Sequence, residues 1–195
     1  MAYKMFETLN NRGLPLTPID IIKNQMLSKL AEANNGRFDD DYAFKLWKKM
    51  IKNLDEDIQI RFFRQFYNVY QFDDEALSIS ERKKSFIKTD GIKKATQSNL
   101  TLTFKKAIAS DAKRLINELI AKSKIYHQLH HSEKYSTSFN PEIILNLQDL
   151  RRVRAASAYA NLMLLLDKKD SVEDEDFNKI VGLLIKYYLR RNITD

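Results

Sequence analysis

Thr17-Pro18-Ile19-Asp20 has the residues of a helix start. Threonine can cap a helix, proline suits the first helical position, and an acidic residue in the first turn opposes the positive end of the helix dipole. Apolar residues then recur at helical spacing, at Ile19, Ile22, Met26, Leu30 and Ala33, before Asn35-Gly36 supplies a stop signal. This stretch therefore predicts a capped helix.

Further helix starts follow along the chain. The acidic runs 39–41 and 55–57 precede two helical patterns, and the stretches 140–142 and 171–174 have capping residues at the right spacing. The expected apolar faces are Tyr42, Leu46, Met50 and Leu54; Ile58, Phe62, Phe66 and Val69; Ile144, Leu147 and Leu150; and Phe177, Ile180, Val181, Leu184 and Tyr188. The aromatic stripe Phe62, Phe66 and Tyr70 is interpreted as core packing rather than as a cofactor wall.

Two other regions complete the expected fold. A long helical pattern runs from about Thr103 to His130, with Phe104, Ile108, Ala112, Leu115 and Leu119 on its apolar face, and residues 153–166 continue the 140–150 helix after a bend. The stretch 71–100 is the least periodic. The sequence predicts an all-α, irregular bundle of about six to eight helices behind a short non-helical segment, residues 1–16.

Composition supports helices and narrows the class of protein. There are only 4 glycines and 3 prolines, fewer than turn-rich sheet proteins need, and the absence of cysteine excludes thiolate metal sites and cysteine nucleophiles. The longest apolar run, 162–166, is far shorter than the roughly 20 residues of a membrane-spanning helix. We therefore expect a cytoplasmic protein without a membrane partner.

The formal net charge of +7 points to a polyanion such as DNA. The candidate contacts are two basic clusters, Arg151, Arg152 and Arg154, and Lys186, Arg190 and Arg191, the second of which is interleaved with Tyr187 and Tyr188. The guanidinium group of arginine can donate two hydrogen bonds to one phosphate, and tyrosine rings can stack on bases. The competing interpretation is a solvated helix face with favourable charge at a helix C-terminus.

No complete catalytic motif is found. His127 and His131 have the spacing of a shared metal site, but no acidic third ligand is suitably placed, and we predict no metal. The four glycines are isolated, so no phosphate-binding loop is present. We expect the isolated chain neither to cut DNA nor to hydrolyse nucleotides.

The run Phe6-Glu7-Thr8-Leu9-Asn10-Asn11-Arg12-Gly13-Leu14-Pro15-Leu16, followed by Asp20, Lys23 and Asn24, resembles the FxxxN motif of the GmrSD-type modification-dependent restriction endonucleases. In that family the motif follows a ParB-like NTP-binding core. The stretch Tyr187-Tyr188-Leu189-Arg190-Arg191-Asn192 resembles the end of the family's helical region, before an HNH nuclease domain. The family's DGQQR and HNH motifs are absent from these 195 residues.

The resemblance implies the following organisation. Residues 1–16 would be the remnant of the upstream ParB-like core, and 17–195 the helical domain, with an internal boundary near 71–100. Phe6 would anchor the motif in the core, while Asn10, Arg12 and Gly13 would lie near the nucleotide pocket. NTP and a divalent metal would be cofactors of the intact protein, an NTP-dependent endonuclease, and not of this chain. An exposed N-terminal segment would also offer a dimer contact.

The resulting hypothesis is a helical segment that links an NTP-binding core to a nuclease and assists DNA contact. The alternative is an autonomous helical module that binds nucleic acid or protein without NTP chemistry, and a purely structural spacer is a third. An open reading frame that extends upstream through a DGQQR motif would support the segment that links an NTP-binding core to a nuclease. It would exclude the autonomous module.

Overall fold

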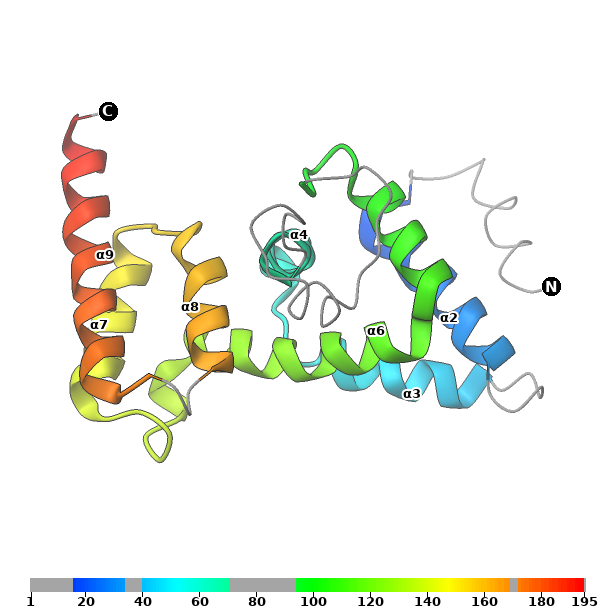
Figure 1. Cartoon of the computed structure of the whole chain (residues 1–195), viewed down its shortest axis with the longest axis horizontal. Coiled ribbons are helices and arrows are strands. Elements are labelled where there is room, and N and C mark those ends of the chain that lie inside the picture. The colour runs from blue at the N-terminus through cyan, green and yellow to red at the C-terminus, as the bar shows by residue number, and fades with distance from the viewer. Residues whose placement is uncertain (1–15, 34–39, 71–93, 169–171, 195) are drawn as a thin grey trace, which may run out of the picture. The chain divides into compact units, whose positions relative to one another are not determined.

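The computed structural model describes residues 16–33, 40–70, 94–168 and 172–194. These residues form seven α-helices and two short 3-10 helices, with no strand among them (Figure 1). The elements are α2 (Pro18–Ala33), α3 (Asp40–Ile51), η2 (Glu56–Ile58), α4 (Gln59–Tyr70), α6 (Leu100–His130), η3 (Ser132–Lys134), α7 (Pro141–Arg152), α8 (Ala158–Asp167) and α9 (Asp174–Thr194). The predicted all-α class and the number of helices are confirmed.

The chain divides into two compact units, unit 1 from Met1 to Ala121 and unit 2 from Lys122 to Asp195. The division falls inside α6, whose residues contribute to both units. Most of the stretch 71–100, where a boundary was expected, lies outside the described residues, as does the segment 1–15.

Unit 1 begins with the capped helix that the sequence predicts. The Thr17 hydroxyl accepts a hydrogen bond from the Asp20 backbone N–H at 3.2 Å, and the Asp20 carboxylate accepts one from the Thr17 N–H at 3.1 Å. This reciprocal pair satisfies two backbone donors at the start of α2. The buried residues of α2 then pack against α3.

An aromatic cluster fills the core of unit 1. The ring of Phe63, on α4, lies 6.0 Å from that of Trp47, 5.6 Å from Phe62 and 5.0 Å from Phe104 on α6, measured between ring centroids. All four are buried. Phe66 and Tyr70 are buried on the same helix, so the interpretation of the aromatic stripe as core packing is confirmed.

The predicted face of α3 was partly wrong. Met50 is buried as expected, but its neighbours in the core are Ala43 and Trp47, while Tyr42 and Leu46 are only half-buried. The difference is a rotation of the face by one residue, because the sequence pattern followed Leu46 rather than the larger Trp47. A tryptophan contributes more buried apolar area than a leucine.

The long helix α6 is interrupted in its middle. Asp111 has non-helical backbone angles (φ −158°, ψ 89°), and its carboxylate accepts a hydrogen bond from the Arg114 N–H at 2.9 Å. Asp111 therefore acts as an N-cap for the second part of α6. The predicted apolar residues lie on both sides of the interruption and are buried.

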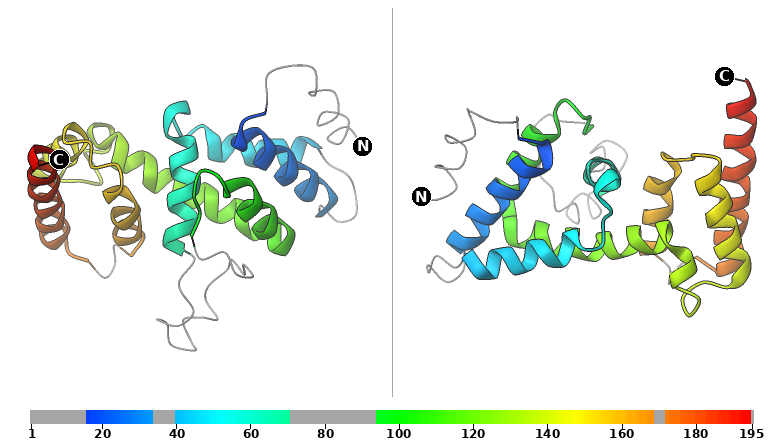
Figure 2. Two further views of the ribbon diagram at one scale, coloured as in Figure 1. Left: turned by 90° about the horizontal axis from the view of Figure 1, so that it is seen from above. Right: turned by 180° about the vertical axis from the view of Figure 1, so that it is seen from behind.

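Unit 2 contains the last turns of α6 together with α7, α8 and α9. Asn140 caps α7 by accepting a hydrogen bond from the Ile143 N–H at 2.9 Å, as the sequence predicts. A 2.5 Å ion pair joins Lys122 of α6 to Asp167 at the end of α8. Figure 2 shows α7 and α9 side by side from two further directions. None of the described helices has the length and hydropathy of a membrane-spanning segment.

Candidate nucleic-acid interface

The first predicted basic cluster lies where α7 ends. Arg151 and Arg152 occupy its last turn, and the chain then leaves the helix through a turn in which the Ala155 N–H donates to the Leu150 carbonyl at 3.3 Å. The Arg154 N–H also donates to the Arg151 carbonyl at 3.0 Å. These two bonds form a Schellman motif, a common way of closing a helix.

Arg154 occupies the position of this motif that glycine normally takes. Its φ is +55°, the only positive φ at a non-glycine residue among those described. The left-handed conformation costs a residue with a Cβ roughly 1–2 kcal/mol. Because Arg154 is exposed, its side chain gives no core packing in return. Unfavourable backbone conformations of this kind cluster at functional sites.

The second predicted basic cluster lies near the end of α9. Lys186, Arg190 and Arg191 are all exposed. Tyr188 turns toward the body of unit 2, where its hydroxyl is 2.5 Å from the Ser157 hydroxyl. Tyr187 remains 59% exposed. Of the two tyrosines that the sequence offered for base stacking, Tyr187 is therefore the accessible one.

The packing of α7 on α9 brings the two clusters to the same end of unit 2. The Asn146 amide donates to the Asn178 side chain at 2.7 Å, and the Asn192 amide donates to the Val153 carbonyl at 2.8 Å. Residue number rises along both helices between these two contacts, so α7 and α9 run in the same direction, and the last turns of α9 extend past the end of α7 (Figure 1). We call Arg151, Arg152, Arg154, Lys186, Arg190 and Arg191 the basic end of unit 2.

The cations of the basic end differ in their partners. Arg152 forms a 2.7 Å ion pair with Asp149, and Arg151 donates to the His130 carbonyl at 3.0 Å. Within the described part of the chain, no ion pair is found for Arg154, Lys186 or Arg190. Two helix C-termini meet here, and their dipoles favour positive charge. The attraction of a helix dipole for positive charge fades beyond the last turn of the helix. Most of the positive charge of the basic end is therefore not balanced by the dipoles.

The three histidines at the end of α6 and directly after it form a packed cluster in unit 2. His127 Nδ1 lies 2.8 Å from the Tyr135 hydroxyl, and the His127 and His131 rings are 4.4 Å apart between centroids. His130 stacks on Tyr159 at 4.1 Å. No group of three potential metal ligands occurs among the described residues. These contacts give each ring a packing role within unit 2.

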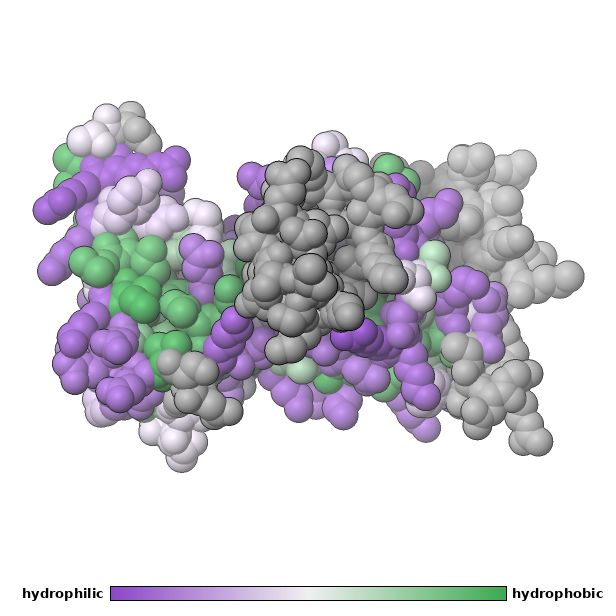
Figure 3. All heavy atoms as spheres, in the orientation of Figure 1, coloured by the Kyte–Doolittle hydropathy of each residue, from purple (hydrophilic) through white to green (hydrophobic). Residues whose placement is uncertain are grey.

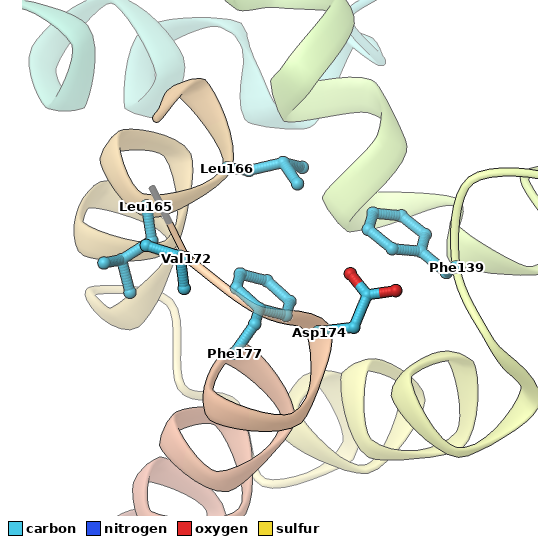
Figure 4. A pocket seen from close by; sticks show the side chains of 6 residues that line it. All are labelled: Phe139, Leu165, Leu166, Val172, Asp174 and Phe177. Carbon is cyan, nitrogen blue, oxygen red and sulfur yellow. The ribbon is translucent and has the colours of Figure 1, made fainter. Parts of the chain in front are cut away.

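A small apolar pocket also lies in unit 2 (Figure 4). Its lining residues are Phe139, Leu165, Leu166, Val172, Asp174 and Phe177. The rings of Phe139 and Phe177 are nearly parallel, with centroids 6.4 Å apart. Among the described residues that line the pocket, Asp174 is the titratable one.

The residues implied by the family resemblance divide into two groups. Phe6, Asn10, Arg12 and Gly13, the predicted motif and pocket residues, lie outside the described residues. Farther along the motif, Asp20 is engaged in the α2 cap, and the Lys23 ammonium lies 5.6 Å from the centre of the exposed Phe44 ring. Asn24 Nδ2 and Gln25 Oε1 are buried and have no hydrogen-bond partner among the described residues.

Sequence reasoning missed the residues that hold the basic end together. Ser157, Asn178 and Asn192 make the hydrogen bonds between the two helices and the turn, and single polar residues of this kind carry no periodic signal. Comparison with family models, with curated proteins and with solved structures finds no match for this chain.

Proposed function

We propose that unit 2 binds the phosphate backbone of DNA through its basic end. The observation that carries this proposal is the parallel packing of α7 and α9, which gathers six cations from two separate sequence clusters at one end. Three of these, Arg154, Lys186 and Arg190, have no carboxylate partner among the described residues. Cations in such an arrangement can neutralise neighbouring phosphates without reading base sequence.

In the wider proposal, the chain is the helical segment of a GmrSD-like defence protein in the cytoplasm. The segment would hold DNA between an upstream NTP-binding core and a downstream HNH nuclease domain. The FxxxN-like run and the terminal Tyr187–Asn192 stretch support this assignment. The second candidate is an autonomous helical module that binds nucleic acid. It would use the same interface, but it would have neither the NTP-binding core nor the nuclease domain.

The exposed Tyr187 adds a second mode of contact. Tyr187 is 59% exposed, follows Lys186 in the sequence and stands about one helical turn before Arg190 and Arg191, so its ring can stack on an unpaired base. Alanine at such a position typically costs about 1–3 kcal/mol per stacked base. We therefore expect Tyr187→Ala to weaken binding to single-stranded DNA more than binding to duplex DNA.

Arg154→Gly gives a test in which function and stability change in opposite directions. Glycine adopts the left-handed conformation without the Cβ penalty, so the free energy of unfolding should rise by about 1 kcal/mol. Removing the cation should weaken duplex DNA binding and lower the salt slope by about 0.9. Denaturant titration and fluorescence anisotropy with labelled DNA measure the two effects.

Lys134→Ala is the matched control, because Lys134 is an exposed cation of unit 2 in η3 and is not one of the six cations of the basic end. It should leave both the unfolding free energy and the DNA affinity close to those of the wild type. A gain in stability for Arg154→Gly without any loss of DNA affinity would contradict the proposal. So would equal losses of affinity for the two variants.

A further inference from the structure

Helix α9 exposes much more apolar surface than a helix at the edge of a small unit requires. Only Phe177 and Val181 of its 21 residues are buried. Leu183 is 65% exposed and Tyr187 is 59% exposed, on the side of the helix opposite to Val181. Figure 3 shows hydrophobic residues over the middle of α9 and hydrophilic ones toward both of its ends.

The exposed side of α9 has a regular spacing. Asp176, Ile180, Leu183, Tyr187 and Arg190 follow one another in alternating steps of four and three residues. This is the heptad spacing that keeps one stripe of a helix facing a partner helix along its length. The stripe is apolar in its middle and charged at its two ends.

The charges of the stripe are self-complementary. Acidic residues open α9, with Asp174, Glu175 and Asp176 in its first turn, and the cations Arg190 and Arg191 lie near its end. Lys179 pairs with Glu175 at 2.7 Å and lies 3.7 Å from the Asp176 carboxylate, so this one cation offsets part of the charge of three acidic residues. Leu183 is midway between Asp176 and Arg190, about two helical turns from each. The helix dipole accounts for the placement of the charges but not for the exposed apolar middle.

We infer that α9 is the contact surface for a second copy of this chain, with the two α9 helices packed antiparallel about a two-fold axis near Leu183. In this arrangement the Leu183 side chains of the two copies meet at the axis. Asp176 of each copy faces Arg190 of the other, on both sides of the axis, as an isologous contact requires. This contact covers Tyr187 and engages Arg190, so the dimer competes with the DNA contacts proposed for these two residues and is measured without DNA. The contact is small, so we expect a weak dimer that dissociates on dilution.

Sedimentation equilibrium of the whole chain from about 5 to about 300 µM should show a concentration-dependent monomer–dimer equilibrium. Leu183→Asp places two carboxylates at the axis and should raise the dissociation constant at least about tenfold. Leu145→Asp is the matched control, because Leu145 is comparably exposed, at 61%, but lies on α7. It should leave the dissociation constant unchanged.

A charge exchange tests the antiparallel register. Asp176→Arg and Arg190→Asp should each weaken the dimer several-fold, because each sets like charges opposite one another. The double variant restores opposite charges in the homodimer and should recover most of the wild-type affinity. Far-UV circular dichroism checks that α9 remains helical in every variant.

Three results would overturn the inference. The first is a wild-type chain that stays monomeric over the whole concentration range. The second is a dimer that Leu183→Asp does not weaken, or that Leu145→Asp weakens equally. The third is a double charge variant whose dimer is weakened as much as the two single changes would weaken it together, although α9 is still folded.

Discussion

Replacing Phe63 with alanine is expected to destabilise unit 1 by about 3–5 kcal/mol. Phe63 is fully buried, and its ring contacts Trp47, Phe62 and Phe104, which come from three helices. Removing the ring leaves a cavity among rigid aromatic side chains that cannot collapse fully to fill it. The single tryptophan of the chain, Trp47, lies in this cluster, so its fluorescence during denaturant titration reports directly on unit 1.

Phe44→Ala is the matched control for this substitution. Phe44 is 39% exposed on α3, where the ammonium groups of Lys23 and Lys48 lie 5.6 and 4.7 Å from its ring centre. Exposed cation–π contacts contribute about 0.5–1 kcal/mol each, so the loss should be no more than about 2 kcal/mol. Equal destabilisation by the two variants would show that the aromatic cluster is not the core of unit 1.

Leu147→Ala is expected to destabilise unit 2 by about 2–5 kcal/mol. Leu147 is 1% exposed on α7, the helix that α9 packs against. Loss of its side chain should loosen both helices and speed hydrogen exchange of their backbone amides. Hydrogen exchange followed by mass spectrometry should show faster exchange in peptides from 141–152 and 174–194.

Leu145→Ala provides the comparison on the same helix. Leu145 is two residues from Leu147 but is 61% exposed. Its truncation should change the free energy of unfolding by no more than about 0.5 kcal/mol and should leave the exchange rates close to those of the wild type. The basic end depends on the packing of α7 against α9. Leu147→Ala should therefore also weaken DNA binding, although the side chain cannot touch DNA.

Local sequence patterns were sufficient to predict most helices. The Thr17 and Asn140 caps and the apolar spacing in α6 depend on residues within one or two turns of each other, and the structure confirms them. The predicted face of α4 was partly wrong, because Val69 is only half-buried and Phe63 and Tyr67 are buried in addition to Phe62 and Phe66. The interruption of α6 at Asp111 was not predicted, because the apolar period continues through it. Neither was the division at residue 121, which depends on contacts between distant parts of the chain.

The sequence predicts which residues form the candidate interface, but it does not predict that the two basic clusters lie together. Both basic clusters are visible in the sequence, where they stand more than thirty residues apart. Their meeting depends on the parallel direction of α7 and α9, which is set by tertiary contacts such as Asn192 to the Val153 carbonyl. The left-handed conformation of Arg154 was also not predictable, because nothing in its local sequence requires glycine.

The salt dependence of duplex DNA affinity tests the central claim most directly. Each phosphate neutralised contributes about 0.9 to the slope of log affinity against log salt concentration, so the six cations of the basic end set an upper limit of about 5. The account predicts measurable binding at low salt, and a slope that falls by up to about 1.8 when Arg190 and Arg191 are both changed to alanine. No binding at low salt, or the same slope for the wild type and the double variant, would contradict it.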